Sequence, residues 1–224
     1  MKLNTALSLA ALALAGALHL GVSAHAQDVI RYRARPDTNT LVRINGSANI
    51  HEWEMEGNII GGFLEVPAAV ILDSSQATLA GAPDGKVKAK AHVQMPVTSI
   101  VNAKWDGMSQ VMQDAMDAKN FPQIIFDLTD MTLKQPHVAG KPYEFEVKGE
   151  IAVHGVTNKI TMPVTIESLD KTRLKVSAEK IPLSMPDFKV TPPVKAGIFI
   201  TKPDITITFD WFIAAPAAKP ADTK

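Results

Sequence analysis

Apolar and polar residues alternate along most of the chain, which is the period of a β-strand with one buried face. The longest unbroken run extends from Lys86 to Met95, with an apolar residue at every odd position. Further alternating runs cover 123–129, 143–153, 160–166, 174–179 and 205–211, and less regular β-prone segments cover 29–34, 40–45, 47–57 and 59–66. Turn signals separate the runs at Asn45-Gly46, 82–85, 139–142 and His154-Gly155. The pattern therefore predicts at least eight short strands.

Strands that each have one apolar and one polar face favour an all-β fold built from a single antiparallel sheet. Closing that sheet into a barrel removes its exposed edges, so we expect a β-barrel of about eight strands. A two-layer β-sandwich is the alternative. We place the barrel domain at 38–213, after an N-terminal segment at 27–37. The Ala- and Pro-rich tail at 214–224 has no large apolar residue, and we expect it to be disordered.

One segment departs from the strand period. Between Ala103 and Asn120, methionines 108, 112 and 116 recur at helical spacing, with acidic residues on the opposite side. This spacing predicts one short amphipathic helix near the barrel mouth, and Phe121-Pro122 ends it because proline disfavours helical geometry in the preceding residue. The methionines either pack the helix against the sheet or form an adaptable lid over the mouth.

The first 26 residues have the pattern of a cleavable export signal. Lys2 supplies the positive start, an apolar run extends from Ala6 to Leu20, and Ala24-His25-Ala26 provides the small residues that signal peptidase reads. The apolar run is shorter than the ~20 residues of a membrane-spanning helix. We therefore expect cleavage after Ala26, a periplasmic or secreted mature protein, and no stable membrane insertion.

Residue counts exclude several classes of function. The chain has no cysteine, which excludes disulfides, iron–sulfur clusters and thiol catalysis. Lys2 is the only charged residue before the predicted cleavage point, so 22 basic and 23 acidic residues remain. A balance so close to neutral gives no electrostatic attraction for nucleic acid, and we expect no nucleic-acid partner. The oligomeric state, a dimer included, is left open.

No pattern of catalytic or metal-ligating residues stands out. No serine lies in a nucleophile elbow, no glycine loop suits a phosphate, and neither HxH nor HExxH occurs. We therefore predict no catalytic residues, no metal and no cofactor, and a protein that is not an enzyme. A hydrolase with two carboxylates facing each other across the barrel is the least favoured alternative.

The apolar strand faces point to a binding function. An eight-stranded barrel is either filled by its own side chains or holds one small ligand. Small residues at Ala89, Ala91, Gly149 and Ala178 favour an unfilled lumen that binds an apolar lipid. The alternative is a filled barrel that acts as a protein-interaction or stress-response module. The predicted lumen residues are Phe63, Ala89, Ala91, Met108, Met112, Ile124, Phe126, Val147, Ile151, Met162, Val176 and Phe209.

Four stretches in the same order resemble the YceI-like family of secreted lipid-binding proteins. They are LVRINGSANIHEWEMEG at 41–57, MQDAMDAKNFPQIIFDL at 112–128, YEFEVKGEIAVHGVTNKITMPV at 143–164 and DFKVTPPVKAGIFITKPDITITF at 187–209. No single stretch is specific, but their ordered set covers nearly all of 38–213.

The resemblance implies an extended lipocalin-like barrel around a long apolar ligand, such as a polyisoprenoid, a quinone tail or a fatty-acid derivative. It also implies a structural or ligand-mouth role for His51 and Trp53. The segment before the helix departs from the family pattern, since Trp105 and a methionine-rich helix replace the usual histidine and dense charge. The identity of the lipid therefore stays open. A polar head at the mouth would meet Asn102, Lys104 or Asp106.

Overall fold

The computed structural model describes residues 28–37, 39–195 and 197–216, and it confirms an all-β fold with one α-helix. The predicted signal at 1–26 and most of the predicted tail lie outside the described residues. The strands are β1 (Val29–Ala34), β2 (Leu41–Ala48), β3 (Glu52–Gly57), β4 (Gly61–Pro67), β5 (Lys90–Pro96), β6 (Ile100–Val101), β7 (Gln123–Leu133), β8 (Tyr143–Val153), β9 (Val156–Ser168), β10 (Arg173–Ser184), β11 (Val194–Lys195) and β12 (Phe199–Ala214). The helices are α1 (Asp106–Ala115) and two 3₁₀ turns, η1 (Val97–Ser99) and η2 (Met185–Phe188).

Eight strands close into an antiparallel barrel, in the order β1-β4-β5-β7-β8-β9-β10-β12. Closure occurs where the start of the domain meets its end, with Arg33 paired to Ala214 and Ala34 paired to Ile213. The barrel therefore begins in β1, inside the segment 27–37 that the sequence pattern separates from the domain. Strand alternation, the basis of the prediction, places one face of each strand inside this closed sheet.

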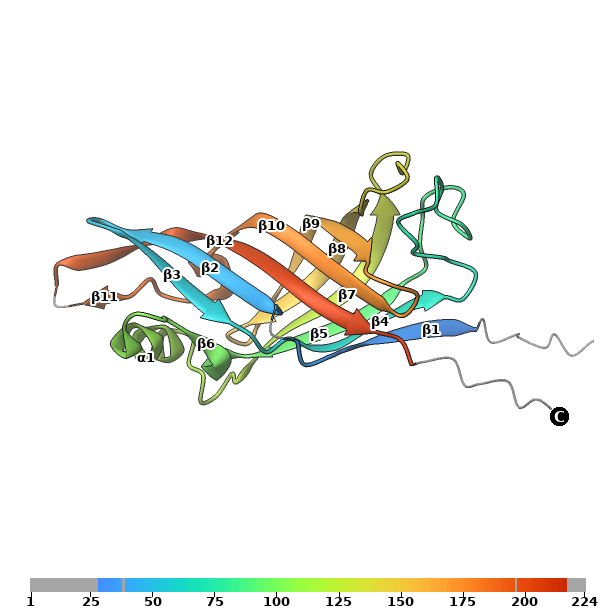
Figure 1. Ribbon diagram of the computed structural model, residues 1–224. Helices are drawn as coiled ribbons and strands as arrows, with labels where there is room; N and C mark the ends of the chain where they lie inside the picture. The colour runs from blue at the N-terminus through green and yellow to red at the C-terminus, as the bar shows by residue number, and fades with distance from the viewer. Residues whose placement is uncertain (1–27, 38, 196, 217–224) are drawn as a thin grey trace, which may run out of the picture.

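The barrel extends beyond its closed part on one side. The long strand β12 pairs with β2 along 201–210 and only afterwards with β1. β3 and β6 continue the sheet from β2, and α1 lies at the same end of the molecule as β2, β3 and β11 (Figure 1). The helix is thus near the barrel mouth, as the sequence predicts.

The opposite end of the barrel contains several of the most deeply buried large side chains. Tyr143, Phe145 and Ile166 are among them. The Tyr143 hydroxyl donates a hydrogen bond to the Asp73 carbonyl oxygen at 2.9 Å, which ties the loop before β5 onto this end. His137 stacks on the Tyr143 ring at 3.8 Å between ring centroids.

One predicted turn is wrong. Asn45-Gly46 lies inside β2, and the chain turns after Ala48 instead. Gly46 is opposite Trp53 in the ladder, and a Cβ at Gly46 would lie 2.1 Å from the Trp53 ring. Glycine is needed here for close packing and not for a turn. The His154-Gly155 turn is confirmed, with positive φ angles of 52° and 73° that suit a two-residue hairpin loop.

The run from Lys86 to Met95 is shorter as a strand than its alternation predicts. β5 begins only at Lys90, and Lys86 makes an isolated bridge to Thr132. The Val87 N–H donates to the Met131 carbonyl oxygen, while the Ala89 N–H turns back to the Val87 carbonyl. The segment before Lys90 therefore leaves the regular ladder.

Candidate functional site

The barrel contains an apolar lumen with two adjoining chambers. The deep chamber, about 170 Å³, lies among the closed barrel strands and includes Ala91, Phe126, Val147 and Phe209. The mouth chamber, about 350 Å³, lies beneath α1 at the extended end. Six residues line both chambers, so the two are parts of one lumen: Val42, Met95, Ile124, Ile151, Leu183 and Ile207.

The deep chamber is apolar throughout. Every side chain that lines it is aliphatic, aromatic or methionine. The indole N–H of Trp211, its only polar group, is already satisfied by the Ile60 carbonyl oxygen at 3.2 Å. A chamber without free polar groups offers water no partners, whereas a hydrocarbon chain fits it.

The mouth chamber is roofed by the apolar side of α1. Met108 and Met112 contribute from the helix, and Ile44 and Met55 contribute from β2 and β3. Most of its remaining wall comes from the segment 183–207, namely Leu183, Met185, Phe188, Val190, Pro193, Phe199, Ile205 and Ile207. Flexible methionine side chains adapt to apolar partners of irregular shape, so this roof suits a variable ligand.

Asn102 positions the helix. Its Oδ1 accepts the backbone N–H groups of Lys104 and Trp105 at 3.0 and 2.8 Å. Its Nδ2 donates to the Glu54 carbonyl oxygen at 2.7 Å, and the Ser109 hydroxyl accepts the Asn102 N–H. These bonds tie the start of α1 to β3.

The three residues expected to meet a polar head at the mouth lie at or just before the start of α1. The side chain of Asn102 is committed to these backbone hydrogen bonds, and neither Lys104 nor Asp106 lines the chambers. His51 and Trp53, in contrast, both line the mouth chamber.

Most of the predicted lumen residues lie where the alternation places them. Met108 and Met112 line the mouth chamber. The deep chamber is lined by Ala91, Ile124, Phe126, Val147, Ile151, Met162, Val176 and Phe209.

The prediction that Phe63 lines the lumen is wrong, because the residue lies outside it. In the β4–β5 ladder it pairs with His92 on the outer face, while Leu64 pairs with Ala91 on the inner face. The Arg31 guanidinium lies over the Phe63 ring at 4.1 Å from its centroid, and Arg31 also pairs with Glu65. The acidic residue two positions after Phe63 was the signal that this face is solvated.

The prediction that Ala89 lines the lumen is also wrong. Ala89 lies in the irregular segment before β5 and lines neither chamber. The argument from small residues also changes. A Cβ on Gly149 would lie 2.4 Å from the Phe126 ring, so Phe126 already occupies that space. Ala178 is buried without lining either chamber, and only Ala91 contributes free volume as predicted.

Several lining residues were missed, although their strands were identified. Ile205, Ile207 and Trp211 alternate on the inner face of β12, together with the predicted Phe209. The same alternation could have found them. Met55, Phe188 and Val190 carry no such signal, because β3 and the segment after β10 are irregular in sequence.

The described residues contain no group of three or more His, Asp or Glu side chains that could hold a metal ion. His92 instead pairs with Asp127 on the outer face, at 2.7 Å between Nδ1 and Oδ1. Within the same part of the chain, no helix is long and apolar enough to cross a bilayer.

Comparison with known proteins agrees with this architecture. A polyisoprenoid-binding domain from Saccharophagus degradans, implicated in plant cell wall breakdown, is 14% identical with a TM-score of 0.59, covering 84% of this chain and all of that one. BcnA from Burkholderia cenocepacia is 16% identical with a TM-score of 0.54, covering 77% of this chain and 94% of its own. No curated protein sequence matches the chain. The family model of the YceI-like domain matches residues 40–212, and the chain belongs to the YceI-like family.

Proposed function

We propose that this protein binds an apolar lipid inside the barrel and carries it without chemical change. The observation that carries the proposal is the two-chamber lumen, whose deep part has only apolar side chains and no free polar group. A barrel filled by its own side chains, the alternative from the sequence, does not fit these chambers. The similar domain from Saccharophagus degradans is described as polyisoprenoid-binding, which supports a long, narrow lipid as the ligand class.

Burial of the lipid chain supplies the affinity. Apolar surface removed from water contributes about 25 cal/mol per Å², so a few hundred Å² of buried chain is worth several kcal/mol before the cost of association. The export signal that the sequence predicts for residues 1–26 supports a carrier that works in the periplasm or outside the cell. A carrier of this kind needs no catalytic residue, metal or cofactor of its own.

Native mass spectrometry of the purified protein, followed by organic extraction, tests the proposal. We expect an apolar lipid to co-purify at close to one molecule per chain. Protein that stays empty after mild purification, and takes up neither a prenol, a quinone nor a fatty acid when these are added, would rule out the carrier function.

Filling the deep chamber gives a matched test. Ala91→Trp places an indole in the deep chamber, and we expect it to abolish lipid uptake while the β-sheet circular dichroism is kept. Ala152→Trp is the control, because Ala152 follows the inward residue Ile151 on the same sheet and therefore faces outward. Equal uptake by the two variants would mean that the deep chamber is not the lipid site.

A further inference from the structure

The wall of the barrel is split between β9 and β10. The two strands pair only where 174–177 of β10 meet 165–168 of β9. Residues 156–164 of β9 pair with β8 alone, and residues 181–184 of β10 pair with β12 alone. The ladder between β9 and β10 therefore has a slit along this stretch. The sheet is closed only where 165–168 pair with 174–177.

A β-bulge in β10 causes the split. The ladder with β12 shifts register between Ala178 and Ile181, and Lys180 has a left-handed φ of 51°. Bulges bend the strand that carries them, which turns β10 away from β9 beyond this point. Pro163 of β9 and Pro182 of β10 have no N–H to donate, as is typical of strands with a free edge.

The turn η2 closes the far end of the slit. The Asn158 side-chain amide donates to the Asp187 carbonyl oxygen at 2.7 Å. The His154 ring nitrogen Nδ1 lies 3.2 Å from the Phe188 carbonyl oxygen. The slit is thus a window with paired strands at one end and a strap at the other, and not a frayed edge.

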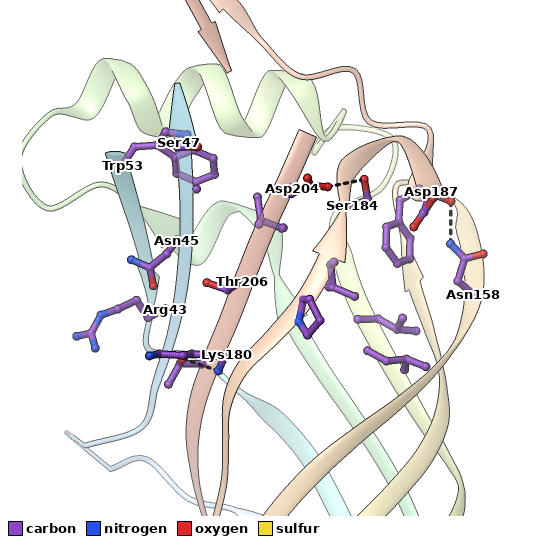
Figure 2. Close-up of a pocket in the computed structure, with 18 of the residues that line it drawn as sticks. Arg43, Asn45, Ser47, Trp53, Asn158, Lys180, Ser184, Asp187, Asp204 and Thr206 are labelled. Atoms are coloured by element: carbon purple, nitrogen blue, oxygen red, sulfur yellow. Dashed lines mark hydrogen bonds between the residues drawn. The ribbon is translucent and has the colours of Figure 1, made fainter. Parts of the chain in front are cut away.

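A broad groove of about 1390 Å³ leads into this window. Figure 2 shows its labelled polar side chains, which come from β2, β12 and β10 on one side and from β9 and η2 on the other. Ile160 and Leu183 line both the groove and the deep chamber, and Ile205 lines both the groove and the mouth chamber. The groove and the lumen are therefore adjacent at the slit, with Ile160 and Leu183 between the groove and the deep chamber.

The chemistry of the groove differs from that of the lumen. Its three basic and three acidic side chains balance, and the rest of its polar lining is hydroxyl and amide. Arg43 is already paired with Glu54 and Glu56 outside the groove. Trp53 lines both the groove and the mouth chamber, and its buried indole N–H has no acceptor among the described residues. A buried donor without a partner is costly, so this indole N–H is a polar group that the fold leaves unsatisfied beside the groove.

We infer that the slit between β9 and β10 is the entrance to the lumen, and that the groove outside it holds an uncharged polar head group such as a quinone ring. This inference rests on the proposed function. The apolar chain passes between Ile160 and Leu183, while the head group stays among the hydroxyl and amide side chains. Entry from the side leaves α1 in place over the mouth chamber.

Bulky adducts on single cysteines test the entrance, because the chain has no native cysteine. Thr161→Cys lies exposed at the rim of the groove, and Gln110→Cys lies exposed on α1 outside both chambers. Each variant is coupled to a polyethylene glycol maleimide. Binding and release of decylubiquinone are then followed in stopped flow by the quenching of tryptophan fluorescence.

We expect the Thr161 adduct to slow both uptake and release by about tenfold or more, since it obstructs one path used in both directions. A simple loss of affinity would speed release instead. The Gln110 adduct should leave both rates as in the unmodified protein. Slowing by the Gln110 adduct alone, or by neither adduct, would overturn the side entrance while lipid binding stands. Absence of quinone uptake by unmodified protein would overturn the quinone head group, and absence of prenol and fatty-acid uptake as well would overturn the entrance together with the proposed function.

Discussion

At the scale of single residues, the contact between Gly46 and Trp53 fixes the wall of the mouth chamber. Gly46→Ala would place a Cβ 2.1 Å from the Trp53 ring, within the packed ladder between β2 and β3. We expect it to destabilise the protein by about 1–3 kcal/mol, the usual cost of overpacking, measured by urea unfolding. Gly61→Ala is the control, because its Cβ would meet mainly the flexible Gln94 side chain. Similar unfolding midpoints for the two variants would contradict this account.

The two tyrosines of the chain predict a stability change in alkali. Burial raises the pKa of Tyr32, and burial together with the nearby Asp73 charge raises the pKa of Tyr143. Unfolded tyrosine ionises near pH 10, so above about that pH the unfolded chain loses its phenol protons first. Stability should therefore be unaffected by these groups below pH 10 and fall as the pH rises beyond it. Phenolate absorbance should appear near pH 10 in urea, but only at higher pH in the folded protein.

At the scale of elements, alternation was enough to predict the long strands, because each has one buried and one solvated face, and the helical spacing of the methionines predicted α1. The face on which a single side chain lies and the exact place of a turn were predicted less well. Phe63 was assigned inward because it is large and apolar, although Glu65 shares its face. The Asn45-Gly46 turn was wrong because glycine serves turns and close packing alike, and only the fold shows that Trp53 lies against it.

The bulge in β10 predicts opposite effects at two neighbouring positions. Lys180 has a left-handed φ, which costs a residue with a Cβ about 1–2 kcal/mol. Lys180→Gly should therefore stabilise the protein slightly, once glycine's extra freedom in the unfolded chain is included. Glu179→Gly, at the adjacent exposed position without positive φ, should destabilise it. Chemical unfolding of both variants measures the difference, and an equal loss of stability would show that the bulge is not strained.

At the scale of the whole molecule, sequence patterns predict a barrel but not where it opens. Closure depends on β1 meeting the last residues of β12, across almost the full length of the chain. The slit depends on a shift of register in β10, and although Pro163 and Pro182 are typical of strands with a free edge, they do not show which neighbouring strand is lost. The lumen volume likewise depends on which rings take the space beside small residues, as Phe126 does beside Gly149.

The positions of the three tryptophans allow the orientation of a bound quinone to be measured. Trp53 lines the groove and the mouth chamber, Trp105 the mouth chamber, and Trp211 the deep chamber. A quinone ring quenches nearby indole fluorescence, whereas its alkyl tail does not. Two variants each keep one tryptophan, Trp53 or Trp211, and have the other two replaced by phenylalanine. If the ring lies in the groove and the tail in the lumen, decylubiquinone should quench the Trp53 variant more strongly than the Trp211 variant. Stronger quenching of Trp211 would mean that the ring enters first and lies at the bottom of the lumen.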